Sequence, residues 1–181
     1  MASDQTQRGA ILSALELTRP ERLLDRDELV RICDEHRANG ERIVFTNGCF
    51  DLLHVGHALY LEAARGLGDR LVVGINSDRS TRELKGLHRP LMEERARALL
   101  LLALRSVDYV SVFDELDPEH LIRAVRPHVL CKGGDYRPEE IVGREFVESD
   151  GGTVTVIPYV PGFSTTELLI RIQRAIAPRI P

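Results

Sequence analysis

The residues best suited to chemistry lie in one segment, Thr46 to His57, with the sequence TNGCFDLLHVGH. It contains two histidines, His54 and His57, one helical turn apart. An apolar run precedes it and an amphipathic helical pattern follows it, so the pattern predicts a turn between a buried strand and a helix N-terminus. Free backbone N–H groups and the positive end of a helix dipole meet at such a turn, and imidazoles add further donors. The segment therefore predicts a phosphate-binding site.

Two other interpretations of these residues are open. Cys49, His54 and His57 could be zinc ligands, but no CxxC motif accompanies them, and Cys33 and Cys131 are distant in the sequence. The histidines could also be solvated loop residues, since an isolated HxxH is a weak signal. The turn glycines and the strand-to-helix context favour phosphate binding, and we expect no metal held by the protein itself.

The elements that must position these residues alternate along the chain. Near-continuous apolar strands separated by helices predict an α/β fold, with a five-stranded parallel sheet and helices on both faces. The predicted strands are 42–46, 70–75, 109–113, 128–131 and 153–157. The first predicted helix begins near Asp25 or Asp27 and ends near Asn39. The other predicted helices are 56–67, 93–104, 118–125, 138–149 and 165–176.

In such a sheet, ligands bind beyond the carboxyl ends of the strands. Polar segments follow four of the predicted strands, at 47–57, 76–78, 132–136 and 162–166. Ser164 in the last of these could cap a helix, hold a second phosphate, or do both. Two familiar nucleotide motifs are excluded. The chain has no GxxxxGK[ST], and Gly66 and Gly68 lack the third glycine of GxGxxG and precede a strand.

Composition sets the remaining bounds. A chain of 181 residues that is 43% hydrophobic and 29% charged is typical of one globular domain, which we place at 26–181 with an N-terminal extension at 1–25. The net charge of -4 and the pI near 5.9 give no electrostatic footprint for nucleic acid or an anionic membrane. Three scattered cysteines favour a reducing compartment. The longest apolar run, Ala98 to Leu104, is far shorter than the about 20 residues of a membrane span, so we expect a cytoplasmic protein.

The motifs together resemble a known family. Residues 47–51 with 54–57, 105–108 and 162–166 are similar to the cytidylyltransferase-like nucleotidyltransferases, and the resemblance covers roughly 42–176. Residues 85–86, 89–90 and 132–136 are most similar to the D-glycero-β-D-manno-heptose 1-phosphate adenylyltransferases within it, which are often fused to a sugar kinase domain. The resemblance implies a Rossmann-like nucleotidyltransferase fold. It also implies that ATP, bound with Mg²⁺, reacts with heptose 1-phosphate to give ADP-heptose and pyrophosphate.

The resemblance also implies roles for individual residues. His54, His57 and Lys85 would be catalytic, with His57 in contact with the α-phosphate. Asp51 and Arg144 would bind the sugar phosphate, although Asp51 could equally cap the turn. Arg105, Asp108 and the apolar run 98–104 would support a homodimer. The nucleotide would be bound by Asn47, Gly48, Cys49, Phe50, Gly56, Lys132, Gly162, Ser164, Thr165 and Thr166.

One departure from the family pattern bears on the nucleobase. Relatives often carry an arginine before the Ser-Thr-Thr segment, whereas this chain has Tyr159-Val160-Pro161 there. The choice of ATP over CTP therefore rests on the subfamily resemblance. A glycerol-3-phosphate cytidylyltransferase is an alternative enzyme with the same nucleotide motifs. A non-catalytic module that binds nucleotides through the same turn is an alternative of another class.

Overall fold

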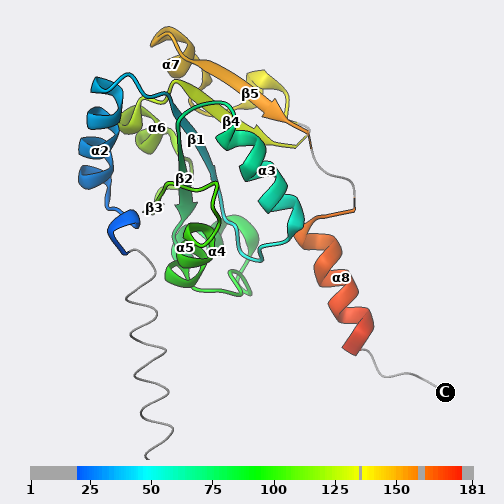
Figure 1. Cartoon of the computed structure of the whole chain (residues 1–181). Helices are drawn as coiled ribbons and strands as arrows, with labels where there is room; N and C mark the ends of the chain where they lie inside the picture. Colours follow the sequence, from blue (N-terminus) through cyan, green and yellow to red (C-terminus); the bar gives the residue numbers. More distant parts are fainter. Residues whose placement is uncertain (1–19, 135, 159–161, 177–181) are drawn as a thin grey trace, which may run out of the picture.

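The computed structural model describes residues 20–134, 136–158 and 162–176, which form one parallel sheet covered by helices (Figure 1). The strand order is β3-β2-β1-β4-β5, and every neighbouring pair is parallel. The predicted fold class is therefore confirmed. The strands are β1 (Ile43–Gly48), β2 (Arg70–Asn76), β3 (Tyr109–Phe113), β4 (Val129–Gly133) and β5 (Thr153–Ile157).

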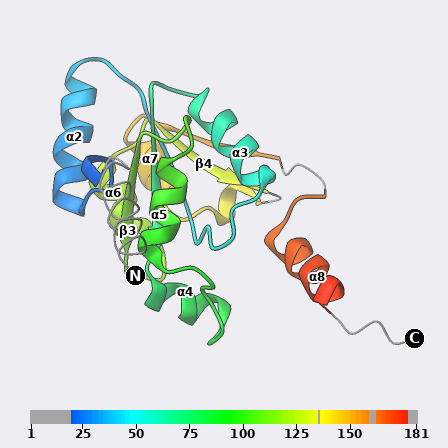
Figure 2. The same ribbon diagram turned by 60° about the horizontal axis from the view of Figure 1, so that its bottom comes forward.

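Helices cover both faces of the sheet. Figures 1 and 2 show α2 and α3 on opposite sides of the strands. On one face α3 (Val55–Arg65) and α5 (Glu94–Leu102) pack in one apolar cluster, and on the other α2 (Arg26–Ala38), α6 (Glu119–Val125) and α7 (Arg144–Ser149) pack in a second. Successive side chains of a strand point to opposite faces, so the central strands are buried on both sides and appear as continuous apolar runs.

One helix was absent from the predicted elements. The polar segment Asp78–Lys85 forms α4, in which Ser80 and Thr81 are the buried residues. Ser77 caps the helix, because its Oγ accepts a hydrogen bond from the Ser80 N–H at 3.0 Å. Lys85 is the last residue of this helix.

The predicted helix 138–149 was too long. It divides into a 3₁₀ turn, η2 (Pro138–Glu140), and α7. Gly143 separates the two with a φ of 86°. This left-handed backbone conformation cannot continue an α-helix.

The residues just before α2 belong to the folded domain. After η1 (Pro20–Arg22), Leu23 forms an isolated bridge with Val110, and the Leu24 N–H donates to the Val110 carbonyl oxygen at 2.9 Å. The Leu24 side chain is only 7% exposed and packs in the core beside α2. Asp25 then caps α2 in a capping box with Glu28. The predicted boundary at 25/26 therefore cuts through the fold, while residues 1–19 lie outside the described structure.

The helix α8 (Thr165–Ile176) differs from the others in its packing. It begins beside the start of α3 and extends away from the sheet in both views (Figures 1 and 2). None of its residues is buried. Of the helices in the described part of the chain, none combines the length and apolar character needed to cross a membrane.

The packing of Leu24 generates a test of the domain boundary. We expect Leu24→Ala to lower the free energy of unfolding by about 2–4 kcal/mol, because it leaves a cavity in the core. Urea denaturation measures this change. The control is Leu87→Ala at a position that is 84% exposed, where we expect a change within about 0.5 kcal/mol. Equal effects of the two substitutions would contradict the assignment of Leu24 to the core.

Candidate active site

Most of the predicted site residues meet where the strand order reverses. From β1 the chain builds outward through β2 and β3, and then returns to place β4 on the other side of β1. A cavity of about 330 Å³ opens there, at the carboxyl ends of β1 and β4. This is the position at which open α/β sheets bind ligands. Predicted residues that line the cavity are Asn47, Phe50, His54, Gly56, His57, Lys85, Lys132, Ser164, Thr165 and Thr166.

The two histidines lie at the N-terminus of α3. His54 is the N-cap residue, with extended backbone and no side-chain capping bond. Its carbonyl oxygen accepts from the His57 N–H at 2.9 Å. The two rings stack with centroids 3.9 Å apart, and the Phe50 ring lies 5.2 Å from that of His57. The two rings therefore lie together at the start of α3, where the first helical turn leaves backbone N–H groups free.

Both imidazoles are electrically unusual. The Nδ1 atoms of His54 and His57 are buried and make no hydrogen bond to any residue that the structure describes. Burial, and then the neighbouring His54, lower the pKa of His57 to about 4, while a polar contact with the Leu52 backbone opposes this shift. Burial also lowers the pKa of His54. At neutral pH the rings are thus uncharged, and an anion placed beside them would favour their protonation.

The turn before α3 is shaped by Phe50. Phe50 has a φ of 47°, in the left-handed region, whereas Gly48 has no positive φ. A Cβ atom at Gly48 would lie 3.1 Å from the Phe50 ring. Gly48 therefore makes room for the aromatic ring, and its own backbone is not left-handed.

A second helix N-terminus reaches the same cavity. A Cβ atom at Gly56 would lie 3.0 Å from both the His54 ring and the Phe163 Cβ, so this glycine lets the start of α8 approach the start of α3. Ser164 caps α8, because its Oγ accepts from the Glu167 N–H at 3.1 Å. Thr165 and Thr166 line the cavity beside it. Gly162 precedes them with a φ of 85° and is not among the lining residues.

Two lysines line the cavity from different elements. Lys132 on β4 donates to Asn47 Oδ1 at 2.8 Å, and its Nζ lies 5.8 Å from the centre of the Tyr136 ring. Burial lowers the pKa of Lys132 to about 8. Lys85 at the end of α4 is exposed. Among the described residues neither lysine forms an ion pair with a carboxylate.

Asp51 is engaged by the polypeptide itself. Its side chain is 1% exposed and pairs with Arg89 Nε at 2.6 Å. Its oxygens also accept from the N–H groups of Leu91 at 2.7 Å and Met92 at 2.9 Å. These contacts fit the turn-capping alternative, in which Asp51 fixes the segment before α5. A contact of Asp51 with the sugar stays a prediction.

Arg97 supports the site and was not identified from the sequence. Its guanidinium is fully buried and donates to the carbonyl oxygens of Cys49 at 2.6 Å and Asn76 at 2.8 Å, and to Asp78 Oδ1 at 2.8 Å. The spacing of Arg97 from Leu101 could have indicated that it is buried. The two residues are one turn apart on the buried face of α5, where a charged side chain needs partners inside the protein.

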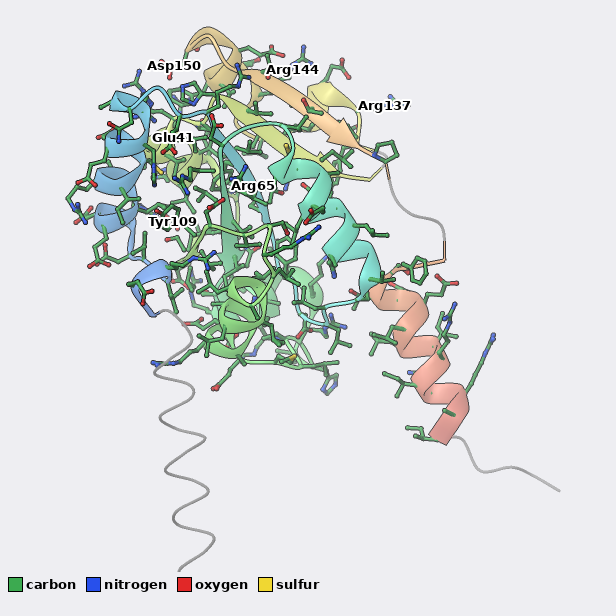
Figure 3. All side chains as sticks on the ribbon, in the orientation of Figure 1. Glu41, Arg65, Tyr109, Arg137, Arg144 and Asp150 are labelled. Carbon is green, nitrogen blue, oxygen red and sulfur yellow. The ribbon has the colours of Figure 1, made fainter. Side chains whose placement is uncertain are left out.

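Some predicted residues lie apart from the cavity. Arg144, at the start of α7, pairs with Glu148 at 2.9 Å and Glu139 at 3.4 Å. Figure 3 shows it beside α7, well away from α8. Cys49 contributes its carbonyl oxygen to Arg97 and places its Sγ 3.7 Å from Asn76 Oδ1. No group of three potential metal ligands occurs within the described residues.

The depressed pKa of His57 links stability to pH. The unfolded chain binds a proton here below about pH 6.5, whereas the folded pKa is about 4. Stability from this residue is therefore complete above the unfolded pKa and falls as the pH drops toward the folded one. We expect thermal unfolding of His57→Gln to depend less on pH than wild type across this window. His88→Gln, at an exposed position, should retain the wild-type slope, and parallel curves for wild type and His57→Gln would contradict the shift.

Comparison with known proteins agrees with this geometry. Residues 45–169 match the model of the Cytidylyltransferase-like family. The chain is 54% identical over 151 residues to bifunctional protein HldE of Pelobacter propionicus, covering 83% of this chain and 31% of the relative. It is 57% identical over 148 residues to the protein of the same name from Koribacter versatilis, covering 82% of this chain and 30% of that one. The chain thus spans about a third of the length of these relatives.

A solved structure extends the comparison to three dimensions. The lipopolysaccharide core biosynthesis protein of Thermoplasma volcanium superposes with a TM-score of 0.56 at 30% sequence identity. The match covers 67% of this chain and 98% of that one. The family model covers more than half of the sequence, and the chain therefore belongs to the cytidylyltransferase-like family.

Proposed function

We propose that this protein transfers AMP from ATP to D-glycero-β-D-manno-heptose 1-phosphate, forming ADP-heptose and releasing pyrophosphate. The observation that carries the proposal is the stacked His54–His57 pair at the start of α3, which lines the cavity that the α8 N-terminus also reaches. Membership of the family supports nucleotidyl transfer. Similarity to HldE proteins and to a lipopolysaccharide core biosynthesis protein supports a sugar phosphate as acceptor.

The proposed reaction needs little acid–base chemistry from the protein. A phosphate monoester has a second pKa of about 6, so the acceptor is mostly a dianion at neutral pH and needs no general base. Its oxygen forms a bond to the α-phosphorus of ATP, and the bond to the departing pyrophosphate breaks. The protein must align these groups and stabilise the charge that develops. His57 would donate to the α-phosphate, while the capped start of α8 would hold the outer phosphates.

Magnesium enters this proposal with the nucleotide. None of the described cavity-lining residues is an aspartate or glutamate, and proteins usually hold Mg²⁺ through one or two carboxylates together with phosphates. The donors present fit an anion and do not fit a cation held by the protein. We therefore assign Mg²⁺ to the ATP phosphates as part of the substrate.

The proposed activity is tested by supplying ATP or CTP with heptose 1-phosphate or glycerol 3-phosphate. We expect pyrophosphate release to be fastest with ATP and heptose 1-phosphate, and mass spectrometry to identify ADP-heptose as the product. Preference for CTP and glycerol 3-phosphate would favour the alternative enzyme. ATP binding without turnover of any pair would favour the non-catalytic module.

The matched variant for this assay is His57→Ala. Loss of one donor to the transition state should lower kcat by about 10² to 10³ while the fold is retained. Circular dichroism and thermal unfolding check the fold. Turnover at the wild-type rate would contradict the role given to His57.

A homodimer is part of the proposal. Leu59 on α3 and Leu100 on α5 are 48% and 41% exposed, and Arg105 joins the ends of these helices by an ion pair with Glu62 at 2.8 Å. We expect light scattering to give about twice the 20.3 kDa of one chain, and Leu100→Glu to reduce it to one, because a charge would be buried at the interface. Leu116→Glu, at a position that is 52% exposed after β3, is the control. A monomeric wild type would overturn the dimer.

A further inference from the structure

Lys132 and Asn47 form a polar pair at the carboxyl edge of the sheet, within the cavity. They follow the paired residues Cys131 and Thr46 on the adjacent strands β4 and β1. Lys132 Nζ donates to Asn47 Oδ1 at 2.8 Å and lies 3.4 Å from the Asn47 carbonyl oxygen. The centre of the Tyr136 ring lies 5.8 Å from Lys132 Nζ. Asn47 and Lys132 thus lie on strands of the sheet, whereas the histidines and Ser164 lie at helix N-termini.

The helix starts already provide for a triphosphate. The N-termini of α3 and α8 adjoin each other at Gly56 and Phe163, and each supplies free N–H groups to an anion. In-line transfer requires the attacking oxygen and the departing pyrophosphate to lie on opposite sides of the α-phosphorus. If the helix starts hold the departing group, the acceptor phosphate needs a separate cation away from them.

Resting on the function proposed above, we propose that Lys132 binds the phosphate of the acceptor sugar and that Asn47 is a positioning residue that directs the Lys132 ammonium group toward it. Both residues were first assigned to the nucleotide. The new assignment rests on their place on the sheet edge and on the hydrogen bond between them. Its chemical class of ligand is a phosphate monoester dianion.

The surroundings of Lys132 fit such a ligand. In the described part of the chain its polar partners are the amide and carbonyl oxygens of Asn47, which leave part of its donor capacity unused. Burial holds its pKa near 8, so the ammonium is costly to keep without an anion. A dianion would stabilise the buried ammonium group more than the neutral amide of Asn47 does. Lys85, the other lysine of the cavity, is exposed and bears no comparable cost.

Steady-state kinetics of Lys132→Met separate the two assignments. We expect KM for heptose 1-phosphate to rise about 10- to 100-fold, as for the loss of one charge-assisted hydrogen bond, and KM for ATP to stay close to wild type. Lys132→Arg keeps the charge and should recover part of the loss. A rise in KM for ATP alone would return Lys132 to the nucleotide and overturn the proposal.

Asn47 variants test the positioning role. Asn47→Ala should raise KM for heptose 1-phosphate with little change in KM for ATP. Asn47→Asp should raise it further, because a carboxylate competes with the sugar phosphate for Lys132. An equal loss in both KM values and in kcat would indicate a merely structural role and overturn this part of the proposal.

Direct binding keeps the inference distinct from the proposed activity. Titration calorimetry of the whole chain with heptose 1-phosphate, in the absence of ATP, should show binding by wild type and weaker binding by Lys132→Met. If wild type binds the sugar phosphate but releases no pyrophosphate with ATP, the proposed function fails and the binding comparison still decides the role of Lys132. If wild type does not bind it, both proposals fall. Should Lys132→Met not fold, the same comparison is made with Lys132→Arg and Asn47→Asp.

Discussion

The burial of the Arg97 guanidinium is the constraint on which the architecture of the site depends. A charged group without solvent is costly unless its donors are satisfied internally. Arg97 meets this demand with the carbonyl oxygens of Cys49, Asn76 and Met92 and with the carboxylate of Asp78. These acceptors lie after β1, at the end of β2, before α5 and at the start of α4. Arg97 therefore holds these four segments together, and its bond to the Cys49 carbonyl oxygen fixes the turn after β1.

Asp51 adds a second attachment to the same turn. Its carboxylate binds Arg89 and two backbone N–H groups of the segment before α5. With Cys49 and Asp51 both held, the intervening Phe50 keeps a left-handed backbone that it would rarely adopt alone. In this backbone conformation the ring of Phe50 packs against that of His57 in the first turn of α3. Arg97 and Asp51 thus hold the turn that places the Phe50 ring against His57.

The sequence predicted the parts of this structure that arise from local pattern. The run at 70–75 gave β2 to within one residue, because a central parallel strand is apolar on both faces. The helix α4 was not predicted because its buried residues, Ser80 and Thr81, are polar and give no apolar pattern of helical spacing. The role of Arg97 was not predicted because the groups that accept its hydrogen bonds are distant in the sequence. The contacts of Asp51 with the 89–92 segment could not be predicted, because these residues are about 40 positions away in the sequence.

The electrostatics of the cavity follow from the burial of its donors. Burial lowers the pKa of His54, His57 and Lys132, because the charged form of each group loses its hydration. At His57 the neighbouring His54 lowers the pKa further. A polyanion reverses the balance, because it favours the protonated form of each ring. The positive charge needed for phosphoryl chemistry can therefore develop when the anion is bound, in a protein whose net charge of -4 would otherwise disfavour its approach.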